Sequence, residues 1–338
     1  MSLTLRRMKY GTALAGAFCR SQILHSSSSP SSWAKVVSEA EKIVGYPTSF
    51  MSLRCLLSDE LSNIALQVRK LVGTKHPLIS TASQRNLAEI TELIHTAFLV
   101  HRGIVNIMEL TSSHGSLKDM QFGNKMAVLS GDFLLANASI GLAQLQNTKV
   151  VELVSSAIGD LVQGVYYENS RTDEEKVTDD ILMINWEEQT FLSHGALLAK
   201  SCQGAMQLAK HDCEVQEMAF QYGKHMSLAH KLHSDLQPFV EGTSCDTMPF
   251  SLNSAPVILH QEASGRDTWI KQFKQAKVNG NQADYAKLHR IIKAGKGVSS
   301  SLDLCHYHGN QALEALRCFP TSEARSTLEN IVYAVTKF

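Results

Sequence analysis

Proline is scarce in this sequence. The 338 residues contain seven prolines, and none lies between Leu78 and Gln237. Because proline interrupts a helix interior, a proline-free run of this length with few alternating β-branched segments favours stacked helices. The seven cysteines are scattered and form no C-x-x-C pair. This argues against a disulfide scaffold or a cysteine zinc site and fits a reducing compartment.

An excess of charge of one sign is also missing, since Lys+Arg and Asp+Glu both number 32. This balance of charge gives no indication of a surface that binds nucleic acid or a membrane. The longest apolar stretch, AVLSGDFLLANASIGLAQL at 127–145, is interrupted by Asp132. We therefore expect a buried helix there and no transmembrane segment.

The amino-terminal end lacks acidic residues up to Glu39, while basic residues stand at positions 6, 7, 9, 20 and 35 among many serines. This composition is typical of a mitochondrial transit peptide, so residues 1–34 are predicted to be a disordered targeting leader to the mitochondrial matrix. The alternatives are a disordered tail without a targeting function and a secretory signal peptide. The signal fits less well, because residues 10–19 are only weakly apolar.

Apolar spacing predicts helices along the rest of the chain, and no internal repeat or linker divides them. One all-α domain at 35–338 is the simplest account. The stretch 120–146 is apolar nearly all round and is predicted to be the central, most buried helix. The predicted helices are 36–45, 56–72, 84–108, 120–146, 149–167, 178–210, 212–236, 256–264, 267–278, 281–293, 297–318 and 321–337.

Three blocks carry a family resemblance: GNKMAVLSGDFLLANA at 123–138, ELIHTAFLVH at 92–101 and GDLVQ at 159–163. Together they resemble the trans-prenyltransferase family, the polyprenyl diphosphate synthases, over about residues 35–338. Residues 36–65 resemble the second, non-identical subunit of heteromeric, decaprenyl-type members. The resemblance implies an isoprenoid-synthase-type bundle of stacked antiparallel helices around a central cavity.

The resemblance also implies the chemistry that the site should carry. In the family an allylic diphosphate ionises, and two facing D-D-x-x-D motifs hold Mg²⁺, which acts as a Lewis acid on the departing oxygens. Residues i and i+4 share a helix face, so the outer carboxylates of each motif point at one metal cluster.

Both motifs are degenerate here. The first should begin after His101, but its ends read Arg102 and Asn106, and no carboxylate survives between them. Arg has no lone pair to offer a metal, and Asn offers a neutral carbonyl. The second motif, at 234–238, keeps one acid in the sequence Ser234, Asp235, Leu, Gln, Pro, and its proline is predicted to end the helix.

Other diphosphate-binding positions of the family are changed too. Ser113–His114 replaces an Arg pair, Ser193–His194 replaces Lys-Thr, and the anion loop at 73–77 lacks both arginines. Packing positions are retained, and three residues are predicted to line a substrate cavity: Ala97, Phe98 and Gln163. The retained packing positions are His95, Ala97, Gly123, Lys125, Gly131, Asp132, Gly159 and Gln163.

Several features have two readings. Arg102 is either an anchor for a diphosphate or partner carboxylate, or an ordinary ion-pairing residue at a helix end. Asp235 fits a helix-end polar residue better than a magnesium ligand.

DDILM at 179–183 imitates a metal motif but fits a helix start. Six residues would suit a metal-dependent hydrolase but lack a third ligand at consistent spacing: His211, Asp212, His225, His230, His233 and Asp235.

The segment between Lys75 and Glu92 is shorter than in the family by roughly one helix of ~10–14 residues. This shortening affects how the region around 56–100 is expected to pack.

These observations predict a non-catalytic or regulatory subunit of a heteromeric all-trans-polyprenyl, decaprenyl-type, diphosphate synthase that makes the ubiquinone side chain. A catalytic subunit is the expected partner and would carry the Mg²⁺, while this chain alone is expected to bind no metal or cofactor. The alternatives are an active prenyltransferase with an atypical diphosphate site and a helical scaffold unrelated to prenyl synthesis.

Overall fold

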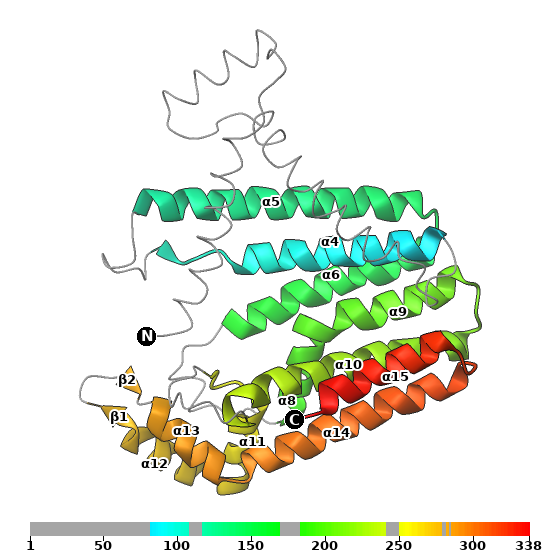
Figure 1. Cartoon of the computed structure of the whole chain (residues 1–338). Helices are drawn as coiled ribbons and strands as arrows, with labels where there is room; N and C mark the ends of the chain where they lie inside the picture. The colour runs from blue at the N-terminus through cyan, green and yellow to red at the C-terminus, as the bar shows by residue number, and fades with distance from the viewer. Residues whose placement is uncertain (1–81, 108–116, 170–182, 241–249, 279–281, 284) are drawn as a thin grey trace, which may run out of the picture. The chain divides into compact units, whose positions relative to one another are not determined.

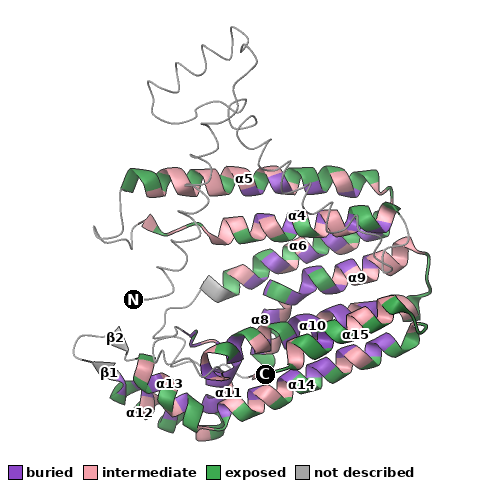
Figure 2. Cartoon of the chain, viewed as in Figure 1, coloured by how far each residue is buried: buried purple, intermediate pink, exposed green. Residues whose placement is uncertain are grey.

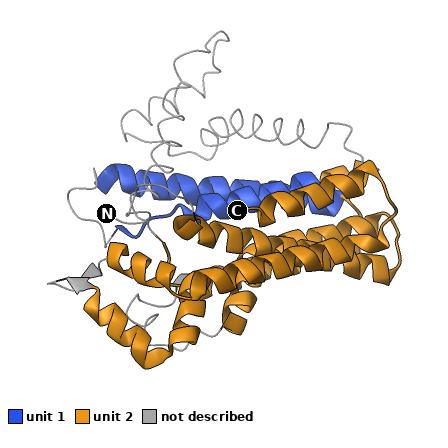
Figure 3. Ribbon diagram, turned by 60° about the horizontal axis from the view of Figure 1, so that its bottom comes forward, with its two compact units in different colours: residues 1–75, 88–144 blue, residues 76–87, 145–338 orange. Residues whose placement is uncertain are grey.

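The computed structural model describes residues 82–107, 117–169, 183–240, 250–278, 282–283 and 285–338. The chain divides into two compact units (Figure 3). Unit 1 contains residues 1–75 and 88–144, and unit 2 contains residues 76–87 and 145–338. The leader at 1–34 and the helices predicted at 36–45 and 56–72 lie outside the described residues, so these calls stay predictions.

In unit 1, helix α4 (Ala82–Arg102, from residue 88 on) packs against α5 (Leu117–Gln144) in antiparallel fashion (Figure 1). Small residues of α5 allow the close approach. A Cβ at Gly141 would lie 2.8 Å from Cγ1 of Ile90, and a Cβ at Gly131 would overlap the ring of His101.

The prediction that 120–146 is the most buried helix is wrong. Of the 28 residues of α5, four are buried, whereas α10, of the same length, buries eleven (Figure 2). The sequence is apolar on all sides, but the described residues cover one stripe of α5, which leaves Val128 and Ile140 exposed. Within the described part of the chain, α5 is also the one helix long and apolar enough to cross a membrane by length and composition.

Unit 2 is built around α10 (Cys213–Val240). Helices α6 (Thr148–Asn169), α9 (Ala196–Leu208), α10 and α14 (Gly297–Ala315) lie side by side in that order, and α15 (Glu323–Thr336) packs on α10 and α14 (Figure 1). This arrangement confirms the predicted all-α class. Other helices that the structure describes in unit 2 are α8 (Met183–Thr190), α11 (Ala255–Ser264), α12 (Arg266–Gln275), α13 (Tyr285–Ala294) and the 3₁₀ turn Leu316–Cys318.

Three predicted helices of unit 2 have different boundaries. The helix predicted at 178–210 contains a π-helical turn at Phe191–Gly195, and its residues 178–182 lie outside the described part. The predicted helix 267–278 ends earlier, at Gln275, and the predicted helix 281–293 begins later, at Tyr285. There two-residue strands β1 (Lys277–Val278) and β2 (Gln282–Ala283) pair antiparallel.

Apolar side chains of unit 2 gather into neighbouring clusters along α10. Near its carboxyl end, Phe239 packs with Trp269 and Phe273 of α12 and Leu288 of α13. Farther up the helix, Leu232 and Leu236 pack with Trp186 and Ile258. The burial of this whole flank of α10 fixes the direction in which each α10 residue points, including those of the second motif.

A pair of histidines, the half-buried His225 and the buried His308, joins α10 to α14. The Nδ1 atoms of His225 and His308 are 2.9 Å apart, so one ring donates its proton to the other. His308 is 2% exposed, and its Nε2 has no hydrogen-bond partner but lies 3.7 Å from Oε1 of Glu187. Burial, followed by the neighbouring charge of Lys224, lowers the pKa of His225 to about 4; burial, followed by His225 and Lys224, lowers that of His308 to about 4.

The histidine pair predicts acid sensitivity. Because the folded pKa of each ring lies below the unfolded value of about 6.5, the unfolded chain binds more protons between these values. The free energy of unfolding should therefore fall as pH drops from about 6.5 toward 4, by at most about 3 kcal/mol for His308. Urea midpoints measured across this range should show the loss.

Replacing both rings, in His225→Leu/His308→Leu, should flatten this pH dependence, while His211→Gln at an exposed position should not change it. An unchanged slope in the double variant would show that other groups cause the acid sensitivity.

Candidate functional site

The first motif begins where α4 ends. Helix α4 stops at Arg102, and the amides of Gly103 and Ile104 bond back to the carbonyls of Val100 and His101 at 3.0 and 3.1 Å. The helix predicted to run to 108 is therefore six residues too long. Arg102 is half-buried and Asn106 exposed, and these two positions do not share a helix face.

A side chain of α5 holds the motif segment where it follows the helix. Oδ1 of Asn124 accepts the N–H of Val105 at 2.9 Å, and Nδ2 of Asn124 donates to the carbonyl of Val105 at 2.7 Å. This pair of bonds imitates a strand pairing and satisfies the backbone after the helix has ended. Sequence reasoning missed it because the two residues are 19 positions apart.

The residue before the motif is fixed by α5 as well. The ring of His101 lies over Gly131, with Nε2 3.3 Å from the carbonyl of Val128 and 3.5 Å from Oδ1 of Asp132. The retained glycine and aspartate of the family block thus position the end of α4. Their contact with His101 is a packing contact, and the motif itself contains no carboxylate.

The second motif lies on α10. Ser234 is exposed and its hydroxyl donates to the carbonyl of His230 at 2.9 Å. Asp235 is 9% exposed, and both of its oxygens have donors within unit 2. Oδ1 pairs with the ammonium of Lys231, and Oδ2 accepts the N–H of Ala255 at 3.1 Å.

The prediction that Pro238 ends this helix is wrong, because α10 continues to Val240. The proline removes one hydrogen bond near the helix end, where little helix remains to be disrupted. Its own carbonyl accepts the Nε2 proton of His289 at 2.7 Å, which ties the last turn of α10 to α13.

These residues do not fit the Mg²⁺ that the family implies. Magnesium takes hard oxygen ligands in octahedral geometry, usually from one or two carboxylates together with substrate phosphates. Within 102–106 there is no carboxylate, and within 234–238 the oxygens of Asp235 are engaged by other donors. Among the described residues, no group of three or more His, Cys, Asp or Glu side chains could hold a metal ion.

The histidines of α10 do not converge either. His225 pairs with His308 of α14, and the ring of His233 stacks on Phe338 at a centroid distance of 4.8 Å. Burial, followed by His233, lowers the pKa of His230, which favours its neutral form. The structure thus does not assemble these histidines into one hydrolase-like ligand set.

The predicted cavity residues are divided between the units. Ala97 is fully buried and Phe98 half-buried in α4 of unit 1. Gln163 is exposed on α6 of unit 2, and its Nε2 donates to the hydroxyl of Tyr167 at 3.4 Å. Their role in a substrate cavity stays a prediction.

The positions that the family resemblance links to anion binding are partly described. Ser193 and His194 lie in the π-helical turn, where the Ser193 hydroxyl donates to the carbonyl of Gln189 at 2.9 Å and lies 2.6 Å from Nδ1 of His194. Farther along the chain, on α9, the Nζ atom of Lys200 forms an ion pair with Oδ2 of Asp160 at 2.5 Å. Residues 73–77, 113–114 and 179–180 lie outside the described part.

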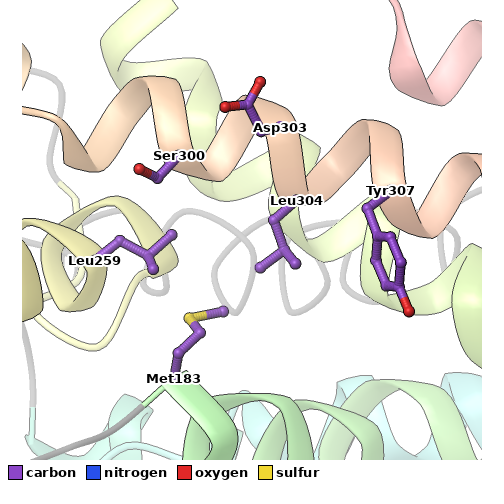
Figure 4. A pocket seen from close by; sticks show the side chains of 6 residues that line it. All are labelled: Met183, Leu259, Ser300, Asp303, Leu304 and Tyr307. Atoms are coloured by element: carbon purple, nitrogen blue, oxygen red, sulfur yellow. The ribbon is translucent and has the colours of Figure 1, made fainter.

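A hollow of about 370 Å³ opens between α8, α11 and α14 (Figure 4). It contains no motif residue. Met183, Leu259 and Leu304 give it an apolar floor, and Asp303 is the charged residue of its lining, so it is not suited to a diphosphate. The other lining residues are Ser300 and Tyr307.

The polyprenyl synthetase family model matches residues 62–245. The human all trans-polyprenyl-diphosphate synthase PDSS2 is 64% identical over 358 aligned residues, covering 93% of this chain and 90% of the human protein. A probable mitochondrial hexaprenyl pyrophosphate synthase of Neurospora crassa is 32% identical over 73% of this chain and 56% of its own length.

Among solved structures, a decaprenyl diphosphate synthase from Rhodobacter capsulatus matches 98% of this chain and 97% of its own, with 18% identity and a TM-score of 0.64. That similarity shows the fold. The family match and the 64% identity show more: this chain belongs to the polyprenyl synthetase family.

The contact between His101 and Gly131 gives a prediction for α5. In Gly131→Ala the new Cβ would lie 2.1 Å from Nε2 of His101, so the ring must move and the end of α4 with it. We expect the free energy of unfolding to fall by about 1–3 kcal/mol in chemical denaturation.

Gly123→Ala is the matched control, because a Cβ at Gly123 meets nothing within 4 Å. It should raise stability by up to about 1 kcal/mol through helix propensity. Equal effects of the two substitutions would contradict the His101 contact.

Proposed function

We propose that this chain is the non-catalytic subunit of a heteromeric, decaprenyl-type all-trans-polyprenyl diphosphate synthase that makes the side chain of ubiquinone. The observation that carries the proposal is the first motif: its residues 102–106 contain no carboxylate and have left the helix after Arg102. A family member without that ligand set lacks the groups that bring Mg²⁺ to a departing diphosphate.

The proposal assigns ionisation of the allylic diphosphate to a separate catalytic subunit, which carries the Mg²⁺. This chain then contributes a folded helical surface that stabilises the partner and shapes the space for the growing apolar product. Its similarity to human PDSS2 over 90% of that protein supports the role of synthase subunit. A basic, acid-free leader at 1–34 and the mitochondrial relative from Neurospora crassa support a place in the mitochondrial matrix.

Helix α5 is the surface that we assign to the partner. Val128 and Ile140 are 41% and 57% exposed on a helix that is long and apolar enough to cross a membrane by length and composition. A membrane is a poor alternative for this surface, because Asp132 lies mid-helix with a 64% exposed side chain. Burial of exposed apolar side chains is a main source of affinity at stable protein interfaces.

The activity test compares three preparations: this chain alone, the catalytic subunit alone and the co-expressed complex. Each receives farnesyl or geranylgeranyl diphosphate, isopentenyl diphosphate and Mg²⁺. The isolated chain should be at least about a thousandfold slower than the complex, since metal stabilisation of the leaving group supplies several kcal/mol. Turnover by the isolated chain at the rate of the complex would support an active enzyme with an atypical site and refute the proposal.

The interface prediction uses a pair of matched substitutions. Ile140→Asp on α5 and Tyr333→Asp on α15 both place a charge at a position 57% exposed. Ile140→Asp should abolish co-purification with the catalytic subunit, because burying an unpaired carboxylate is costly. Tyr333→Asp should co-purify like the wild type, and loss of the complex in both variants would argue against α5 as the specific interface.

A further inference from the structure

The position of Asp235 requires a positive partner. Its side chain is 9% exposed, and an ionised carboxylate at such a position is strongly destabilising unless it is paired and hydrogen-bonded. In the family pattern this position belongs to a metal motif, where a divalent ion would supply the charge. The residues around Asp235 do not fit such an ion, because its two oxygens already have protein donors.

The charge comes from Lys231, one helical turn earlier. Residues four apart share a helix face, and the ammonium of Lys231 contacts Oδ1 of Asp235 directly. The Lys231 side chain is 24% exposed, so this pair is much less solvated than an ordinary surface pair. A lysine at this position places its ammonium beside the carboxylate.

The second oxygen of Asp235 performs a separate task. It accepts the N–H of Ala255, the first residue of α11. The residue that precedes this helix, Ser254, makes no side-chain capping bond, and its buried hydroxyl has no hydrogen-bond partner. Asp235 therefore supplies, from 20 residues away, the negative cap that the start of α11 lacks locally.

We infer that Lys231 is the resident cation of this former metal motif, and that the chain of contacts from Lys231 through Asp235 to Ala255 links α10 to α11 without a divalent ion. This inference concerns the stability and metal independence of the chain. It holds or fails independently of whether the chain turns over prenyl substrates, because its test measures neither rate nor complex formation.

The test compares melting temperatures of the full chain in EDTA and in excess Mg²⁺. The wild type should melt at the same temperature in both, within about 1 °C. Lys231→Met leaves Asp235 buried without its cation and should lower the melting temperature by about 4 °C. Lys224→Met, a lysine seven residues earlier on the same helix, should lower it by less than about 1 °C.

A second substitution isolates the unpaired charge. Adding Asp235→Asn to Lys231→Met should recover roughly half of the lost melting temperature, because the amide still accepts from Ala255 and carries no charge. Two results would overturn the inference: a Mg²⁺-dependent rise in the wild type that Asp235→Asn abolishes, or a Lys231→Met loss no larger than that of Lys224→Met. The first requires no lysine variant, so the inference stays testable even if Lys231→Met does not fold.

Discussion

The carboxylate of Asp235 is the constraint on which this account of unit 2 depends. It sits at the buried flank of α10, receives the Lys231 ammonium from its own helix and holds the first amide of α11. A carboxylate placed in this way is part of the protein's internal packing. The same residue cannot also reach outward to a metal cluster without abandoning the start of α11.

The first motif likewise presents no carboxylate to a metal, but for a different reason. There the carboxylates are absent, and the backbone that would display them leaves the helix at Gly103 and is clamped by Asn124. The ring of His101 over Gly131 fixes the last turn of α4. His101, Gly131 and Asn124 thus serve the packing of α4 on α5.

Much of the fold could be predicted from the sequence, because helix periodicity is a local property of the chain. Most described helices lie within a few residues of their predicted ranges. The differences arise from contacts between distant residues. The end of α4 depends on Asn124, the persistence of α10 past Pro238 is accompanied by a bond to His289, and the exposure of α5 depends on what covers it.

The candidate site shows the same division. That residues 102–106 contain no carboxylate and that Asp235 is the one acid in 234–238 could be read from the sequence alone. The pairing of Lys231 with Asp235 could be predicted from their four-residue spacing. Its importance depends on the burial of Asp235 and on the hydrogen bond to Ala255, which the sequence does not place nearby.

We propose that this chain does not assemble a divalent metal cluster around a diphosphate. Electron paramagnetic resonance of Mn²⁺ titrated into the isolated chain with inorganic diphosphate tests it most directly. The account predicts no protein-immobilised Mn²⁺ beyond that of the manganese–diphosphate complex in buffer. Two or more immobilised ions per chain, lost in Asp235→Asn, would contradict it.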